Sequence, residues 1–190
     1  MKMDSSNSNL YVILLHAGMV DKANNSVTTS LTLNDIQDIA RSCRTYGVKQ
    51  FFVAHPAPSL QRLATRIRMH WEQGYGSTYN TKRKEAFSTV KLVADLEEAL
   101  FHIDNETGKN ATLVATSAKD GSHRVQFAEF SKTIKETDSP YLLMLGTGWG
   151  MGDELMHRAN LTLQPIKGPT PFNHLSVRAA CAIMLDKILS

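Results

Sequence analysis

The chain has 190 residues, of which 42% are hydrophobic and 21% are charged, which suits one globular domain and excludes a disordered chain. Its two cysteines, Cys43 and Cys181, lack a Cys-x-x-Cys spacing, which excludes a disulfide framework and a cysteine zinc site. The net charge is only +3, yet residues 41–91 hold ten lysines and arginines against two acids, which favours a polyanionic partner over simple solvated helix faces.

The first residues are not expected to be a signal peptide or a membrane anchor. Residues 1–9 are mostly polar and predict a flexible tail, and the apolar run from Leu10 ends at His16, too soon to span a bilayer. The histidines have no spacing typical of metal ligands. We therefore expect a cytoplasmic protein with no membrane contact and no metal.

Apolar runs and helical patterns then alternate along the chain. Strands are predicted at residues 10–15, 50–54, 88–93, 112–116, 141–145 and 161–164. Helices are predicted at residues 34–46, 59–73, 95–104, 126–136, 150–158 and 174–189. Thr32 with Asp35 resembles a capping box and Gly47 a helix stop, while Ser59 and Gly74 would begin and end the second helix. This alternation predicts a single α/β domain over residues 10–190, with a mostly parallel sheet covered by helices on both faces.

The stretch "LLMLGTGWGMGDEL", residues 142–155, places glycines directly after a predicted strand, where such sheets bind ligands. It is not a dinucleotide fingerprint, because counting from Gly146 the third glycine position is Met151, and no acid lies between Glu154 and Asp186. It is not a P-loop either, because it contains no lysine. The loop suits close backbone contact with a flat, neutral group such as adenine, or it is a tight turn without a ligand.

The next stretch, "LTLQPIKGPTPFNHLSVRAACAIML" at residues 161–185, runs from a strand through a Gly/Pro-rich loop into a helix of small residues. Asn173 or His174 is expected to start that helix. Ser176 and Arg178 would lie in its first turn, where N–H groups can hold an acceptor.

These two stretches together resemble motifs two and three of the SPOUT superfamily of S-adenosylmethionine-dependent RNA methyltransferases. Motif one, N-x-G-x-x-x-R-[TS]-A-x-x-F-G, is similar to "DIQDIARSCRTYGV", with Arg41 at the arginine position. Motif three, S-L-N-V-S-V-A-A, is similar to "FNHLSVRAA". The chain departs from these motifs with Asp35 and His174 at the two asparagine positions and no glutamate in the glycine loop. Longer strings resemble a small, single-domain bacterial branch of the superfamily.

The resemblance implies S-adenosylmethionine as cofactor, a C-terminal trefoil knot and a homodimer whose sites form at the interface. By the same analogy the cofactor site is expected at Ala115, Thr116, Ser117, Leu145, Gly146, Thr147, Gly148, Trp149, Gly150, Leu163, Gln164, Pro165, Ile166, His174, Leu175 and Ser176. Trp149 would either cover the cofactor or pack beneath the loop.

Four residues are candidates for catalysis. Arg41 lies on the polar face of its predicted helix, and because arginine stays protonated it is expected to hold an RNA phosphate and stabilise oxyanion charge rather than act as a base. Arg44 is its neighbour on that helix, and His174 and Ser176 lie near the expected target. Each also has a purely structural alternative, as does His16 at the end of the first strand.

The stretch "YGSTYNTKRKEAF" combines aromatic and basic residues. Cations attract phosphates and aromatic rings stack on unpaired bases, so this stretch predicts an RNA-binding surface. With the two helix arginines, the expected RNA contacts are Arg41, Arg44, Tyr75, Tyr79, Lys82, Arg83 and Lys84.

The sequence thus favours an RNA methyltransferase acting on tRNA, with the ribose 2′-oxygen slightly ahead of guanine N1. A knotted protein that binds RNA or S-adenosylmethionine without catalysis is the alternative. A nicotinamide- or nucleotide-binding protein is disfavoured by the glycine spacing.

Overall fold

The computed structural model describes residues 8–190. Of the tail predicted at residues 1–9, residues 1–7 lie outside the described residues. Asn9 is held against the sheet, because its side-chain amide donates hydrogen bonds to the carbonyl oxygens of Thr137 and Ser139 at 2.6 and 2.8 Å. Contacts with the sheet thus begin just before the first strand.

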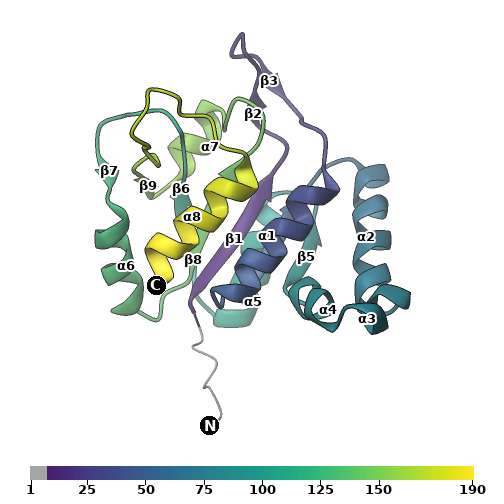
Figure 1. The fold of residues 1–190 in the computed structure, drawn as a ribbon. Coiled ribbons are helices and arrows are strands. Elements are labelled where there is room, and N and C mark those ends of the chain that lie inside the picture. The colour runs from purple at the N-terminus through teal and green to yellow at the C-terminus, as the bar shows by residue number, and fades with distance from the viewer. Residues whose placement is uncertain (1–7) are drawn as a thin grey trace.

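Seven strands form one sheet in which every neighbouring pair is parallel (Figure 1). In spatial order they are β5 (Val90–Val93), β4 (Gln50–Ala54), β1 (Leu10–Leu15), β8 (Tyr141–Gly146), β6 (Thr112–Ala115), β9 (Leu161–Leu163) and β7 (Arg124–Val125). The inner strands β1 and β8 are almost completely buried, as expected of apolar runs covered on both faces. The predicted α/β fold with a mostly parallel sheet is confirmed.

Helices cover both faces of this sheet (Figure 1). One face carries α1 (Leu33–Thr45), α2 (Pro58–Glu72), α4 (Thr81–Phe87), α6 (Phe127–Lys135) and α8 (Val177–Leu189); the other carries α5 (Leu96–Thr107) and α7 (Asp153–Arg158). Because side chains alternate along a strand, Leu10, Val12 and Leu14 enter the first core. Tyr11 and Ile13 enter the second. None of the helices in residues 8–190 is long and apolar enough to cross a bilayer.

The predicted long elements are present, with shifted ends. Thr32 caps α1 as expected, but α2 begins at Pro58 with Ala57 as its N-cap, so Ser59 is not a cap. Helix α8 begins at Val177 instead of residue 174, because the Ser176 hydroxyl accepts the Ala179 N–H and fixes the start there. Helix α7 begins at Asp153 instead of residue 150.

Several short elements were not predicted. They are the antiparallel pair β2 (Met19–Val20) and β3 (Ser26–Val27), the edge strand β7, the helix α3 (Tyr75–Tyr79) and the helix α4 that follows it. The β2 segment lies against the glycine loop, since the Val20 N–H donates to the Gly150 carbonyl at 2.9 Å. This contact fixes the glycine loop against β2, beyond the carboxyl ends of the strands.

Candidate active site

Three segments expected to hold a cofactor meet at one edge of the sheet. Strands β8, β6 and β9 are direct neighbours and parallel, so the loops that follow them leave from the same, carboxyl edge. The Thr116 hydroxyl joins two of these strands by donating to the Met144 carbonyl oxygen at 2.8 Å. The sheet order thus brings residues 115–117, 145–150 and 163–166 together.

The glycine loop after β8 has a backbone that other residues would strain. Gly148 and Gly150 have φ values of +61° and +105°, in the region that favours glycine. Thr147 anchors the loop, because its hydroxyl donates to the Leu15 carbonyl oxygen at 3.1 Å and contacts the Thr29 hydroxyl. Trp149 is 59% exposed, so it does not pack beneath the loop. The loop is a turn anchored by Thr147 that presents main chain and one indole ring to solvent.

The segment between β9 and α8 returns over the loop that follows β6. The Asn173 side-chain amide donates to the Ala118 carbonyl oxygen at 2.8 Å, and Lys167 pairs with Asp120 at 2.9 Å. His174 and Leu175 are exposed and precede the helix instead of belonging to it. The segment therefore holds these two residues at the carboxyl edge, where α8 begins (Figure 1).

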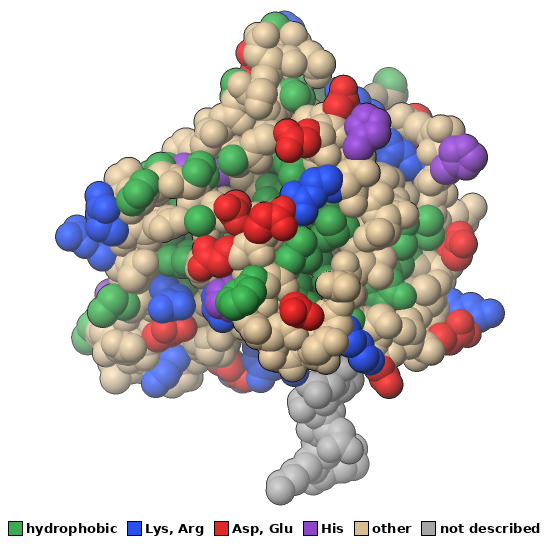
Figure 2. All heavy atoms as spheres, turned by 180° about the vertical axis from the view of Figure 1, so that it is seen from behind, with side chains coloured by type: hydrophobic (Ala, Val, Ile, Leu, Met, Phe, Trp, Pro, Cys, Tyr) green, Lys and Arg blue, Asp and Glu red, His purple; other side chains and the backbone are tan. Residues whose placement is uncertain are grey.

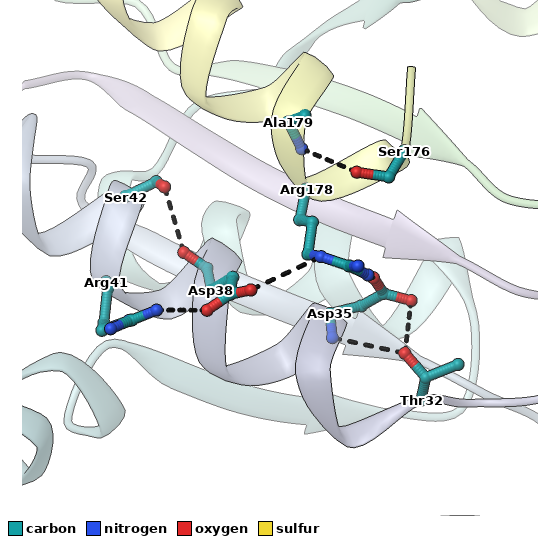
Figure 3. Close-up of polar contacts among 8 residues, drawn as sticks. All are labelled: Thr32, Asp35, Asp38, Arg41, Ser42, Ser176, Arg178 and Ala179. Carbon is teal, nitrogen blue, oxygen red and sulfur yellow. Dashed lines mark hydrogen bonds and ion pairs between the residues drawn. The ribbon is translucent and has the colours of Figure 1, made fainter. Parts of the chain in front are cut away.

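A groove of about 510 Å³ lies along the contact between α1 and the first turns of α8. It is lined by Asp38, Arg41, Ser42, Thr45, Tyr46, Ser176, Arg178, Ala179 and Ala182. Figure 3 shows the polar contacts along it: Arg41 pairs with Asp38, and Arg178 reaches across from α8 to α1. Arg41 and Ser176 are both candidates for catalysis and lie far apart in the sequence, yet they line the same groove.

A family model described as "SAM-dependent RNA methyltransferase" matches residues 9–190. The chain belongs to this family. The match confirms the family that the motif resemblance implied.

Two relatives illustrate the match. A "tRNA (guanine-N(1)-)-methyltransferase" of Nitratidesulfovibrio vulgaris is 40% identical over 181 residues, which are 95% of this chain and 42% of that protein. The chain therefore spans less than half the length of that relative. An uncharacterised protein of Aquifex aeolicus is 33% identical over 184 residues and is matched over 90% of its own length.

Solved structures agree with the fold. The SpoU methyltransferase AviRb of Streptomyces viridochromogenes, in complex with AdoMet, superposes with a TM-score of 0.59 at 17% identity, covering 96% of this chain and 57% of that one. The TrmH/SpoU tRNA modifying enzyme of A. aeolicus gives 0.56 at 16% identity, covering 96% and 74%. At such identity the likeness concerns the fold alone.

The carboxyl edge has features that fit the adenosine part of the family's cofactor. A Cβ atom placed on Gly150 would meet no heavy atom within 4 Å, so the main chain there faces open space. Trp149 and Leu175 expose 59% and 45% of their surfaces and offer apolar faces to a purine ring. Glycine main chain and exposed apolar side chains are what a bent, mostly neutral nucleoside needs.

The remaining predicted cations differ in their surroundings. Arg44 points to α4, where its guanidinium binds the Glu85 carboxylate and holds the pKa of that carboxyl below its ordinary value. Arg83 stacks its guanidinium on the Trp71 ring, 4.3 Å from the centroid. Lys82 and Lys84 are exposed. Two of the three α4 cations thus face solvent, and Arg44 is outside the groove.

Beside them stand two tyrosines on the short helix α3. Tyr75 and Tyr79 are each 76% exposed, and their rings stack with centroids 6.0 Å apart at an interplanar angle of 23°. The opposite face of the molecule carries the acidic helix α5, and Figure 2 shows acidic side chains near the middle of that face. The basic aromatic surface of α3 and α4 lies on the other side of the sheet, the side that carries α1 and the groove.

Sequence reasoning singled out Arg41 but missed the residues that surround it. Asp38 was not a candidate, and Asp35 was noted only as part of a capping box with Thr32 and as a departure from motif one. His16 is 1% exposed, with Nδ1 at 2.9 Å from the Ala54 carbonyl oxygen, and desolvation lowers its pKa.

Among residues 8–190, no three His, Cys, Asp or Glu side chains gather as a metal site would require.

Proposed function

We propose that this enzyme methylates tRNA at the edge formed by the loops after β6, β8 and β9. The observation that supports this site is the convergence of those three loops beside the groove that contains Arg41. The name of the relative from Nitratidesulfovibrio vulgaris contains tRNA, which favours that RNA class.

In this proposal the cofactor supplies a methyl group that its sulfonium has already activated. The residues that would hold its adenosine are those expected from the sequence at 115–117, 145–150, 163–166 and 174–176. Trp149 and Leu175 would cover the purine, and the glycines would let the main chain approach it. The knot belongs to the same proposal: the Asn173 and Lys167 contacts hold the final segment against the loop that α8 would have to pass.

The acceptor is proposed to be a ribose 2′-oxygen, with guanine N1 as the second candidate. An arginine at the motif-one position favours the ribose, whereas the name of the Nitratidesulfovibrio vulgaris relative favours guanine N1. Mass spectrometry of nucleosides from tRNA treated with enzyme and labelled cofactor distinguishes the two, because the label stays on the ribose in one case and on the base in the other.

Arg41 is proposed to act on the RNA rather than on a proton. Its guanidinium stays charged at physiological pH, so it is suited to hold a phosphate and to stabilise negative charge on the attacking oxygen. The proton would then pass to the substrate phosphate or to water. Ser176 is engaged as the N-cap of α8, so its proposed part is to fix the start of that helix beside the cofactor.

Replacing Arg41 tests this role. The variant Arg41→Ala is expected to lose methyl transfer by about 100-fold, the effect of removing one oriented donor at a developing oxyanion. Its affinity for S-adenosylmethionine, measured by calorimetry, should remain within twofold. Arg158→Ala is the matched control, because Arg158 forms a comparable ion pair with Glu97 on the other face. Turnover of Arg41→Ala equal to that of the control would rule the role out.

We further propose that two copies of the chain complete each site. Arg41 lies eight residues after the start of α1, or about 12 Å along the helix from the edge where α1 begins. At that distance from the cofactor edge of its own chain, Arg41 is better placed to reach the cofactor edge of a second copy that docks on α1 and α8. Sedimentation should give a dimer, and mixing Arg41→Ala with Gly150→Val should restore part of the activity. A fully active monomer would contradict this arrangement.

A binding protein without catalysis remains the second candidate. Asp35 stands at the motif-one asparagine position and is engaged by Arg178, so that part of the motif does not have its usual chemistry. Binding of both S-adenosylmethionine and tRNA without label transfer would support this candidate over the enzyme.

A further inference from the structure

Arg178 connects two aspartates of α1 to the start of α8 (Figure 3). Its Nη1 lies 2.9 Å from Oδ1 of Asp35, and its Nε lies 3.4 Å from Oδ2 of Asp38. The other carboxylate oxygen of Asp38, Oδ1, accepts from Arg41. Asp38 is therefore shared between Arg178 and Arg41.

Asp35 is the fixed end of this chain of contacts. Only 11% of its side chain is exposed, and its Oδ2 accepts the Thr32 hydroxyl at 2.5 Å while Oδ1 accepts from Arg178. A carboxylate this buried requires a charged partner, because removing that partner leaves an uncompensated buried charge. The Asp35–Arg178 pair is consequently held in place, unlike ion pairs between two exposed side chains.

The pair combines two departures from the motifs. Asp35 stands where motif one has asparagine. Counting from His174 at the asparagine of motif three, the first alanine of that motif is Arg178. The two substituted positions are adjacent in space and carry opposite charges, so each substitution compensates the other.

We propose that Arg178 is a positioning residue for Arg41, an inference that rests on the proposed function. With Arg178 present, the Asp38 carboxylate is held between two guanidiniums, and its charge is shared by both. Arg41 then keeps a fixed direction along the groove and retains donors for an RNA phosphate. Without Arg178, Asp38 neutralises Arg41 alone, and the negative charge left on Asp35 repels the substrate.

The same contact links Arg41 to the cofactor segment. Arg178 follows Ser176 by two residues, at the point where residues 174–176 lead into α8. Arg178 therefore aligns the start of α8, beside the cofactor edge, with the first two turns of α1, and Asp38 extends this link to Arg41 in the third turn.

The sharpest test uses a double variant that keeps the fold. Arg178→Ala alone leaves Asp35 buried and unpaired, so it can fail to fold. Asp35→Asn with Arg178→Ala restores the motif residues, removes both charges and should keep the melting temperature close to that of the wild type. We expect this double variant to lower kcat about tenfold, with the KM for S-adenosylmethionine within twofold. Wild-type turnover in this variant would overturn the proposal.

If Arg178 acts by positioning Arg41, the loss of kcat in the double variant should require Arg41, whereas a general structural effect should not. In an Arg41→Lys background, the same double substitution should lower kcat by less than twofold, because contacting residues are not additive. A full tenfold loss in that background would overturn the proposal. Arg178→Lys should recover only part of the activity, since a single ammonium does not reproduce the guanidinium fork.

A measurement without substrate keeps this inference separate from the proposed function. The NMR signal of the Arg41 Nε–H can be recorded in protein labelled with ¹⁵N-arginine and is assigned by its loss in Arg41→Lys. This signal should shift in the double variant and stay unchanged in Arg158→Ala. An unshifted signal overturns the positioning of Arg41, whatever the activity. Absence of methyl transfer by the wild type, with the signal shifting as expected, would instead overturn only the proposed function.

Discussion

Arg83 lies between two exposed lysines on α4, yet its guanidinium packs over the Trp71 ring instead of facing solvent. The sequence analysis did not separate these three cations, because it predicted no helix here. With α4 in place, the buried Ala86 and Phe87 lie three and four residues after Arg83 and mark its side as the inward one. The partner, Trp71, comes from α2, and only the packing of α2 against α4 brings it there. Arg83 is thus mainly a packing residue, and the RNA-binding prediction rests on Lys82 and Lys84.

This division predicts opposite results for neighbouring residues. Lys82→Glu with Lys84→Glu should weaken tRNA binding and reduce the slope of log affinity against log salt by about two, one for each lost phosphate contact. Arg83→Ala should leave that slope nearly unchanged and lower stability by about 0.5–2 kcal/mol through the lost cation–π contact. Fluorescence anisotropy over a salt series and thermal unfolding measure the two effects. Equal salt slopes for wild type and the lysine variant would contradict the surface assignment.

Among the elements, the strands at 10–15 and 50–54 have the bounds that the sequence predicts, because buried parallel strands are short, nearly uninterrupted apolar runs. Helix α3 could not be predicted in this way. It has only five residues and contains a glycine, so it has no helical periodicity to detect. Its position against α2 requires a small residue at Gly76, because Trp71 and His70 leave no room for a Cβ atom there.

A methyl group at Gly76 should therefore disturb α3. A Cβ atom there would lie 2.6 Å from Cε3 of Trp71, whose ring is already stacked against Phe87 and Arg83. We expect Gly76→Ala to lower the free energy of unfolding by about 1–3 kcal/mol through overpacking, and to weaken RNA binding by displacing the tyrosine pair. Gly168→Ala is the control, because a Cβ atom there meets nothing within 4 Å and the change should stay within about 0.5 kcal/mol. Equal urea midpoints for the two variants would contradict this explanation.

For the whole molecule, the layer architecture follows from the alternating pattern, but the strand order does not. Local periodicity carries no information on which strand neighbours which, so the central position of β8 between β1 and β6 appears only in the structure. The same holds for the site: the glycine loop and Arg41 could be identified from motifs, whereas the Arg178 contacts required knowing that α8 lies against α1.

The stability of the fold should depend on pH through His16, which is buried directly after the end of β1. Its pKa is lowered mainly by desolvation, so below pH about 6.5 the unfolded chain binds a proton that the folded protein resists. Stability should therefore fall as the pH drops from 7 to 5. The carboxyls of Asp21 and Glu85 have lowered pKa values and contribute only at more acidic pH.

His16→Asn should remove this part of the pH dependence, because asparagine can donate to the Ala54 carbonyl oxygen without titrating. His157→Asn, at an exposed histidine of α7, is the matched control and should keep the wild-type slope. Urea unfolding at several pH values measures both. A His16→Asn slope equal to that of the wild type would show that another group is responsible.

The place of β8 also has a consequence for synthesis on the ribosome. Strand β1 can pair with β4 early in synthesis. Its other neighbour, β8, lies about 125 residues further along the chain and is synthesised later. At a translation rate of about 5–20 residues per second, this apolar edge stays open for roughly 6–25 s. During that interval the nascent chain exposes a strand able to pair with other chains, so a binding chaperone should raise the soluble yield more than any stabilising substitution in α8.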